Sequence, residues 1–125
     1  MTITVVNIRR LNMYDDYYHI GGTTYLHAHG GHHLVYCGRR NYSYQVLESP
    51  LANPYQLKRE ADRAARIDDY QRWFHSKVQD GDMAVADELA RLLKLASEGD
   101  LELACYCKPK LCHCDIVKIF LDAHL

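Results

Sequence analysis

The last quarter of the sequence places the tightest limits on the fold. Residues 101–107 alternate in the manner of a strand, and residues 115–121 carry apolar side chains at helical spacing. A strand-to-helix turn therefore lies between them, and this region holds four of the five cysteines together with His113. Ligands bind at such turns in open α/β sheets, because unpaired backbone N–H groups and the helix dipole attract anions and lower thiol pKa values. We therefore expect the chemistry of the chain to lie here.

The rest of the chain adds strands and helices in an order that predicts an α/β domain. Apolar patterning predicts strands over residues 2–8 and 33–37 and helices over residues 58–78 and about 83–96. Residues 14–33 are rich in glycine, histidine and tyrosine without a sustained period, and we expect an inserted loop or a short hairpin there. The order favours one small α/β domain over residues 1–125, with a mostly parallel, Rossmann-like sheet flanked by helices.

Length and charge limit the classes of partner. A chain of 125 residues fits one domain with an ordinary core. Its formal net charge of −1 gives no bulk attraction to nucleic acid or to a membrane surface, so phosphate recognition would need a local basic patch. No apolar run reaches the roughly 18 residues of a membrane span, and the first residues lack the order of a signal peptide. We expect a cytoplasmic protein with reduced cysteines, and the sequence does not predict its oligomeric state.

The cysteine cluster allows three interpretations. Cys105 and Cys107 share a face of the expected strand, and Cys112, His113 and Cys114 follow, which together offer enough soft ligands for a tetrahedral zinc ion. Alternatively, most of the thiols are small buried hydrophobic groups. In the third interpretation, the helix start presents a thiol or an imidazole to a bound anion. We favour the third, so Cys112 and His113 are the candidate catalytic residues, and no metal ligand or cofactor is assigned.

Basic residues flank a stiff loop. Residues 49–54 contain two prolines, whose rings fix φ and restrict the preceding residues. The basic residues nearest to this loop in sequence are Arg39, Arg40, Lys58, Arg59 and Arg63. Guanidinium groups beside amide donors suit the recognition of phosphate or carboxylate. For Lys58, Arg59 and Arg66 a solvated helix face is the better prediction, whereas Arg39 follows a strand and a glycine and is expected at the edge of the sheet.

Ordered motifs over most of the chain resemble one family. The motifs are Val6-Asn7-Ile8-Arg9, Tyr36-Cys37-Gly38-Arg39, Ser49-Pro50-Leu51-Ala52-Asn53-Pro54-Tyr55, Arg63-x3-Ile67-x2-Tyr70-x2-Trp73-Phe74, and Leu103-Ala104-Cys105-Tyr106-Cys107-Lys108-Pro109-Lys110-Leu111-Cys112-His113-Cys114-Asp115. The pattern resembles the DUF4326 family, a set of small proteins of unassigned function in bacteria and their phages. The resemblance covers most of the chain outside residues 14–33.

Four positions depart from the pattern that the family usually shows. This chain has alanine, tyrosine, tyrosine and cysteine where the family usually has glycine, phenylalanine, tryptophan and glycine, at Ala52, Tyr55, Tyr106 and Cys114. The thiol of Cys114 is therefore outside the family pattern, which weakens a zinc site built from Cys112, His113 and Cys114 together. The departure does not affect Cys112 and His113.

The resemblance brings no reaction with it, but it implies which positions belong to a site. They are Asn7, Arg9, Gly38, Arg39, Ser49, Pro50, Asn53, Arg63, Cys107, Cys112, His113 and Asp115. Most follow strands or begin loops, so we expect them to meet in one pocket at the strand ends. The residues assigned to ligand binding are Asn7, Arg9, Gly38, Arg39, Ser49, Asn53, Arg63 and Asp115.

The sequence thus predicts a protein that binds, and in the leading hypothesis acts on, a small anionic ligand, best matched by a nucleotide or a nucleotide-derived metabolite. Arg39 and Asn53 are expected to hold phosphate or sugar, and His113 or Cys112 to act as acid, base or nucleophile. Two alternatives stay open. One is a protein that senses or sequesters the same ligand without turnover, and the other is a zinc-stabilised interaction protein.

Overall fold

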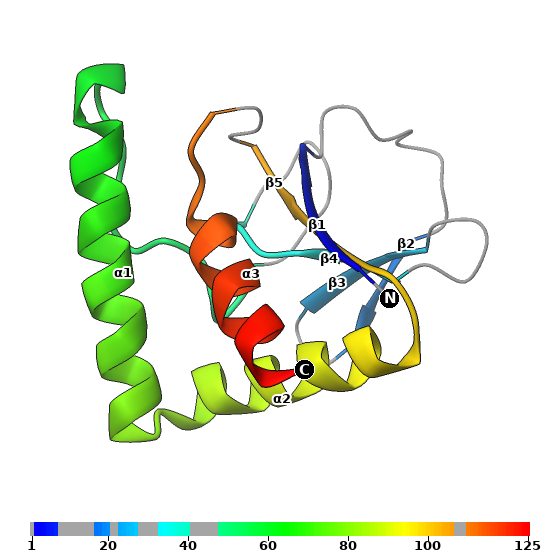
Figure 1. The fold of residues 1–125 in the computed structure, drawn as a ribbon. Helices are drawn as coiled ribbons and strands as arrows, with labels where there is room; N and C mark the ends of the chain where they lie inside the picture. Colours follow the sequence, from blue (N-terminus) through cyan, green and yellow to red (C-terminus); the bar gives the residue numbers. More distant parts are fainter. Residues whose placement is uncertain (1, 8–16, 21–22, 28–32, 41–47, 107–109) are drawn as a thin grey trace.

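The computed structural model describes residues 2–7, 17–20, 23–27, 33–40, 48–106 and 110–125. Its elements in chain order are β1 (Ile3–Asn7), β2 (Tyr17–Ile20), β3 (Thr23–His27), β4 (His33–Tyr36), the short 3-10 helix η2 (Glu60–Asp62), α1 (Arg63–Asp80), α2 (Met83–Glu98), β5 (Leu101–Cys105) and α3 (His113–His124) (Figure 1). The predicted small α/β domain is confirmed.

One sheet runs through the domain in the order β1-β5-β4-β3-β2. Strand β5 lies between β1 and β4 and is parallel to both, with Leu101 in register with Ile3 on one side and with His33 on the other. The side chains of Leu101, Leu103, Ala104 and Cys105 are all buried, as is typical of a parallel strand that is covered on both faces. Three parallel strands therefore form one half of the sheet, with β1 at its edge.

The other half of the sheet is antiparallel. Strand β3 pairs with β4 and β2 pairs with β3, both in antiparallel register. Both strands fall in residues 14–33, where the sequence left open a loop or a hairpin, and the structure contains the hairpin strands. Because two of the five described strands are antiparallel to their neighbours, the likeness to a Rossmann sheet is loose.

The helices are joined and capped by ordinary local signals. Gly81 ends α1 with a φ of 72°, and its N–H donates to the carbonyls of Lys77 and Val78. Asp82 then caps α2 by accepting a hydrogen bond from the N–H of Val85 at 3.1 Å. Helix α1 begins at Arg63, five residues later than its apolar pattern predicted, because η2 occupies the preceding residues. None of the helices in the described ranges has the length and hydropathy that crossing a membrane requires.

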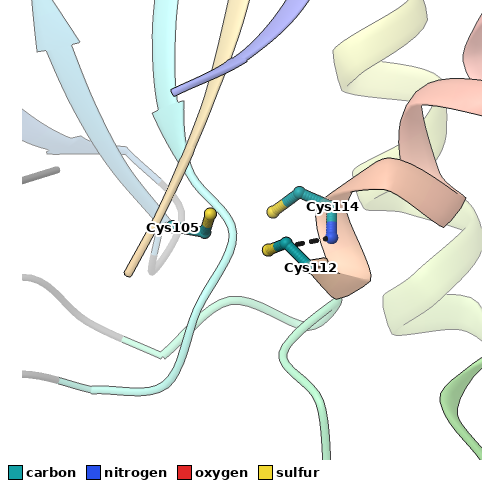
Figure 2. Close-up of side chains that lie close together, drawn as sticks. All are labelled: Cys105, Cys112 and Cys114. Carbon is teal, nitrogen blue, oxygen red and sulfur yellow. Dashed lines mark hydrogen bonds between the residues drawn. The ribbon is translucent and has the colours of Figure 1, made fainter. Parts of the chain in front are cut away.

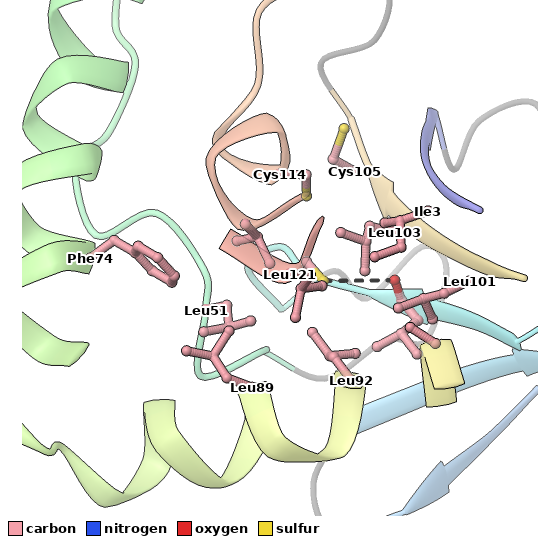
Figure 3. Close-up of a cluster of buried hydrophobic side chains, with 14 of the residues drawn as sticks. Ile3, Leu51, Phe74, Leu89, Leu92, Leu101, Leu103, Cys105, Cys114 and Leu121 are labelled. Carbon is pink, nitrogen blue, oxygen red and sulfur yellow. Dashed lines mark hydrogen bonds between the residues drawn. The ribbon is translucent and has the colours of Figure 1, made fainter. Parts of the chain in front are cut away.

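The hydrophobic core lies between the central strands and the helices. Helix α3 packs against β1 and β5, α2 against β5 and α3, and α1 against α3 and α2. Figure 3 shows the side chains that meet there, among them Leu51, Phe74, Leu89, Leu92, Leu101, Leu103 and Leu121. Each fully buried leucine or phenylalanine contributes about 1.5–3 kcal/mol to stability. The loop before η2 joins this core through Leu51, whose carbonyl accepts a hydrogen bond from the buried hydroxyl of Tyr70 at 2.8 Å.

Candidate ligand pocket

A pocket with a volume of about 340 Å³ opens where β4 and β5 end. The two strands are parallel, with Tyr36 opposite Ala104, so their carboxyl ends meet at the same edge of the sheet. Residues that follow each strand form part of the wall, and the loop around Asn53, the first turns of α1 and the first residue of α3 complete it. Segments that are distant in sequence therefore meet in one cavity.

The wall of the pocket is basic. Four arginines line it, and none of the lining residues that the structure describes is an aspartate or a glutamate. These arginines are Arg39, Arg40, Arg63 and Arg66. Such a wall attracts anions by charge and offers planar donor groups for oxyanions.

Two of the arginines are held in place by neighbouring groups. Arg39 donates from Nε to the backbone carbonyl of Asn53 at 2.9 Å. Arg63 donates from Nε and Nη2 to the carboxylate of Glu60 at 3.0 and 2.8 Å, and from Nη1 to the carbonyl of Leu111 at 3.1 Å. The hydrogen bond from Arg63 lowers the pKa of Glu60 to about 2, so this carboxylate stays charged at neutral pH.

Arg66 has a donor without a partner. Its Nη2 lies 3.2 Å from a carboxylate oxygen of Asp69. Its Nε is buried and has no hydrogen-bond partner among the residues that the structure describes. Leaving a buried donor unpaired costs about 1–3 kcal/mol. Because Arg66 lines the pocket, its guanidinium group is a candidate contact for an anion.

Gly38 sits where a side chain would collide with the pocket wall. A Cβ atom added at Gly38 would lie 2.4 Å from the hydroxyl oxygen of Tyr36. The residue Tyr36 is 1% exposed. The Tyr36 hydroxyl donates to the carbonyl of Arg39 at 2.5 Å, and the carbonyl of Gly38 accepts from the N–H of Ser49 at 2.9 Å. The glycine therefore allows the turn after β4 to fold over the ring of Tyr36.

His113 opens α3 and is the histidine in the pocket wall. It is 7% exposed, and its Nε2 lies 2.6 Å from the carbonyl of Cys37, so Nε2 carries the proton and donates. Its Nδ1 lies 3.7 Å from the sulfur of Cys112. Burial opposes the charged imidazole, but the contacts with Cys112 and with the Cys37 carbonyl outweigh burial and raise the pKa of His113.

Cys112 caps α3 and does not belong to the pocket wall. Its sulfur accepts a hydrogen bond from the N–H of Cys114 at 3.4 Å, and its own N–H donates to the carboxylate of Asp115 at 3.0 Å, which makes a capping box. The side chain is fully buried. A nucleophile must reach its substrate, so the structure gives Cys112 a structural contact and no open path to a ligand in the pocket.

Three sulfurs gather beside the pocket. The Sγ atoms of Cys105, Cys112 and Cys114 all lie within 4.8 Å of one another, a grouping that could hold a metal ion (Figure 2). The thiol contacts with Cys105, Cys112 and Cys37, together with burial, raise the pKa of Cys114 well above its usual value. The described residues contain four cysteines, and none of them forms a disulfide: Cys37, Cys105, Cys112 and Cys114.

A protein-family model for a domain of unknown function, DUF4326, matches residues 26–123, which is well over half of the chain. This chain belongs to the DUF4326 family. No curated protein and no solved structure matches it. The activity of this DUF4326 protein must therefore be argued from its own pocket.

The DUF4326 structure brings five of the suspected positions together in the pocket wall. These are Gly38, Arg39, Asn53, Arg63 and His113. Cys112 and Asp115 cap α3, the Ser49 hydroxyl accepts from the N–H of Leu51 at 3.0 Å, and the Asn7 side chain donates to the carbonyl of Tyr106 at 3.2 Å. Arg9 and Cys107 lie outside the described residues.

Several lining residues were not singled out from the sequence. Arg66, for which a solvated face was predicted, lines the pocket one helical turn after Arg63, and the i, i+3 spacing of the two arginines is the signal that could have found it. Tyr36, Tyr55 and Tyr106 also line the pocket, and no periodic pattern marks them.

Proposed function

We propose that this pocket binds a small anionic ligand, best matched by a nucleotide or a nucleotide-derived metabolite. One observation carries the proposal: four arginines and a histidine line one cavity at the carboxyl ends of two parallel strands. Strand ends in parallel sheets are common ligand sites, and guanidinium groups recognise phosphate oxygens through paired N–H donors. A phosphate or carboxylate group is therefore the part of the ligand that these residues would hold.

The arginines differ in what they offer to such an anion. Arg39 is anchored through Nε to the Asn53 carbonyl, which reduces the conformational entropy that binding must remove. Arg66 offers a buried Nε donor that has no partner among the described residues. We place a hydrogen bond to the anion at Arg66, where a rotation of the side chain would bring this unpaired donor to a ligand oxygen.

The size and the aromatic residues of the pocket favour a mononucleotide over a bare anion. A volume of about 340 Å³ is at the small end of the range for ligand sites and greatly exceeds what one phosphate needs. Tyr55 and Tyr106 line the same cavity, and Tyr55 is 38% exposed. An aromatic ring of this kind can stack on a nucleobase, an interaction worth about 1–3 kcal/mol per base.

Binding can be tested by isothermal titration calorimetry with AMP, ADP, inorganic pyrophosphate and adenosine. We expect AMP or ADP to bind more tightly than adenosine, because adenosine lacks the anion. Equal affinity for adenosine and AMP, or no binding by any of the four, would contradict the proposal.

A matched pair of variants tests the role of the pocket arginine. Arg66 and Arg72 lie on α1 and both pair with Asp69, at 3.2 and 2.6 Å, but only Arg66 lines the pocket. We expect Arg66→Ala to weaken nucleotide binding roughly tenfold, which corresponds to about 1.4 kcal/mol, and Arg72→Ala to change it less than about twofold. Equal losses in the two variants would show a general charge effect in place of a contact.

Turnover is a separate question from binding. His113 is the lining residue whose ring nitrogens can exchange a proton, and it is the first position to test for acid or base catalysis. Chromatography of nucleotides incubated with the protein detects phosphate release and base release. Product formation that His113→Gln abolishes, with binding retained, identifies an enzyme. Binding without product formation identifies a sensing or sequestering protein.

A further inference from the structure

The anion pocket leaves a second group of side chains without a role. Cys105 ends β5, and Cys112 and Cys114 lie at the start of α3, so two different elements bring their sulfurs within 4.8 Å of one another. In Figure 2 the side chains of Cys112 and Cys114 point from the start of α3 toward β5, where Cys105 lies. All three are at most 1% exposed. A fourth thiol, that of Cys37 after β4, is also buried, and it donates to the carbonyl of Val35 at 3.8 Å.

The spacing of the sulfurs is close to what a tetrahedral ion requires. Zinc binds thiolates at about 2.3 Å, which places the sulfurs of a tetrahedral site about 3.8 Å apart. The three sulfurs, all within 4.8 Å of one another, would need to close by less than about 1 Å to reach that geometry. Side-chain rotation alone covers such a distance, so the backbone of β5 and α3 would keep its place.

Backbone and ring contacts orient the sulfurs of Cys112 and Cys114. The N–H of Cys114 donates to the sulfur of Cys112 at 3.4 Å, at the positive end of the α3 dipole. The ring of His113 lies on the other side, with Nδ1 3.7 Å from the sulfur of Cys112 and Nε2 3.7 Å from the sulfur of Cys114. Backbone N–H groups and imidazoles around a thiolate are the kind of outer contacts that orient metal ligands.

We propose that Cys105, Cys112 and Cys114 supply three ligands to a thiophilic metal ion, with zinc as the best-matched ion. Soft thiolate ligands in a tetrahedral set select zinc or iron over magnesium and calcium. The proposal stands independently of the anion pocket. It deepens the zinc interpretation of the sequence.

The cluster lies next to the pocket. Cys105 and His113 line the pocket, and the ring of His113 also contacts the sulfurs of Cys112 and Cys114. A metal bound by the three sulfurs would tie the end of β5 to the start of α3.

The test is a titration of the reduced, metal-free protein with Co²⁺, followed by displacement with Zn²⁺. We expect one Co²⁺ per chain, with a thiolate-to-cobalt charge-transfer band and the visible bands of tetrahedral coordination, and we expect Zn²⁺ to abolish both. Elemental analysis after purification without chelator should then find zinc or iron near one equivalent. A protein that binds neither ion, or a cobalt spectrum without the sulfur band, would overturn the proposal.

Variants separate coordination from simple packing. Cys105→Ser and Cys114→Ser should weaken Co²⁺ binding by more than about tenfold. The matched control is Val117→Ala, which shortens a fully buried side chain of α3 without removing a sulfur and should leave the cobalt spectrum unchanged. Serine variants that bind Co²⁺ as tightly as the wild type would show that these thiols only fill the core.

A measurement on the wild type covers the case in which the serine variants do not fold. Bound zinc should protect Cys105, Cys112 and Cys114 from alkylation in mild denaturant, and mass spectrometry of the peptides identifies the protected residues. Equal alkylation of these three cysteines with and without zinc would refute coordination.

Discussion

Replacing Gly38 with alanine should destabilise the protein through a collision with one buried ring. The added Cβ would lie 2.4 Å from the hydroxyl oxygen of Tyr36, 2.6 Å from its Cζ and 3.0 Å from its Cε1. The Tyr36 side chain is 1% exposed, and its hydroxyl donates to the Arg39 carbonyl. Its ring meets the ring of Tyr106 edge-on, with 6.0 Å between the ring centroids, so it has no empty space to enter. Relief of the collision requires the ring or the turn after β4 to move.

The magnitude follows from three contributions. Overpacking of a filled core costs about 1–3 kcal/mol. Loss of the Tyr36 hydrogen bond adds about 0.5–1.5 kcal/mol. The smaller conformational freedom of alanine in the unfolded chain returns about 0.4–1 kcal/mol. We therefore expect Gly38→Ala to lower the free energy of unfolding by about 1–3 kcal/mol, as measured by urea denaturation.

A double-mutant cycle isolates the collision. Tyr36→Phe removes the atom nearest to the new Cβ, so Gly38→Ala should cost about 1 kcal/mol less in the Tyr36→Phe background. The control is Gly81→Ala, where φ is 72° and nothing lies within 4 Å of the added Cβ. Its cost of about 1 kcal/mol comes from the backbone and should be the same in both backgrounds. A Gly38→Ala protein within 0.5 kcal/mol of wild type, or one whose cost is equal in the two backgrounds, would refute the reasoning.

Two further changes test individual side chains. Tyr70→Phe should lower the free energy of unfolding by about 1–2 kcal/mol, because it leaves the buried carbonyl of Leu51 without its donor at 2.8 Å. The control is Tyr55→Phe at an exposed position, which should change the free energy of unfolding by less than about 0.5 kcal/mol. Equal effects of the two variants in urea denaturation would contradict this prediction. The hydrogen bond from Arg63 lowers the pKa of Glu60 from 4.5 to about 2, so the stability that this carboxylate contributes is present above pH 4.5 and is lost as the pH falls toward 2. The Tm difference between wild type and Glu60→Gln should therefore shrink over that range, and a difference that does not change with pH would show that the pair contributes nothing.

Local patterns predicted most of the fold. The periodicity of residues 83–96 and 115–121 reports which face of each helix is buried, and the observed α2 and α3 agree with it. The start of α1 was wrong by five residues, because the residues that form η2 carry helix-forming side chains while their backbone takes a tighter turn. The pairing of β3 with β4 could not be predicted, since residues 14–33 have no alternating pattern to fix a register.

The site was predictable where strand ends decide it. Arg39 follows strand β4, and His113 begins the helix that comes after strand β5. The parallel pairing of β4 with β5 alone therefore places both residues at one edge of the sheet. The direction of Cys112 was not predictable, because the N-cap position turns its sulfur back toward the N–H of Cys114. The approach of Cys105 to Cys112 and Cys114 depends on how α3 packs against β5, which no local pattern contains.

The position of β5 in the sheet sets an order of events during synthesis. Strands β2, β3 and β4 can pair with one another as soon as they leave the ribosome, since each is antiparallel to its neighbour in sequence. Strand β1 has no such partner: it pairs with β5, and Thr2 donates to the carboxylate of Asp100 at 2.8 Å, 98 residues along the chain. The first strand must therefore wait, unpaired in this sheet, until residues 101–105 emerge, and a chaperone that covers apolar segments early in translation should raise the yield of folded protein.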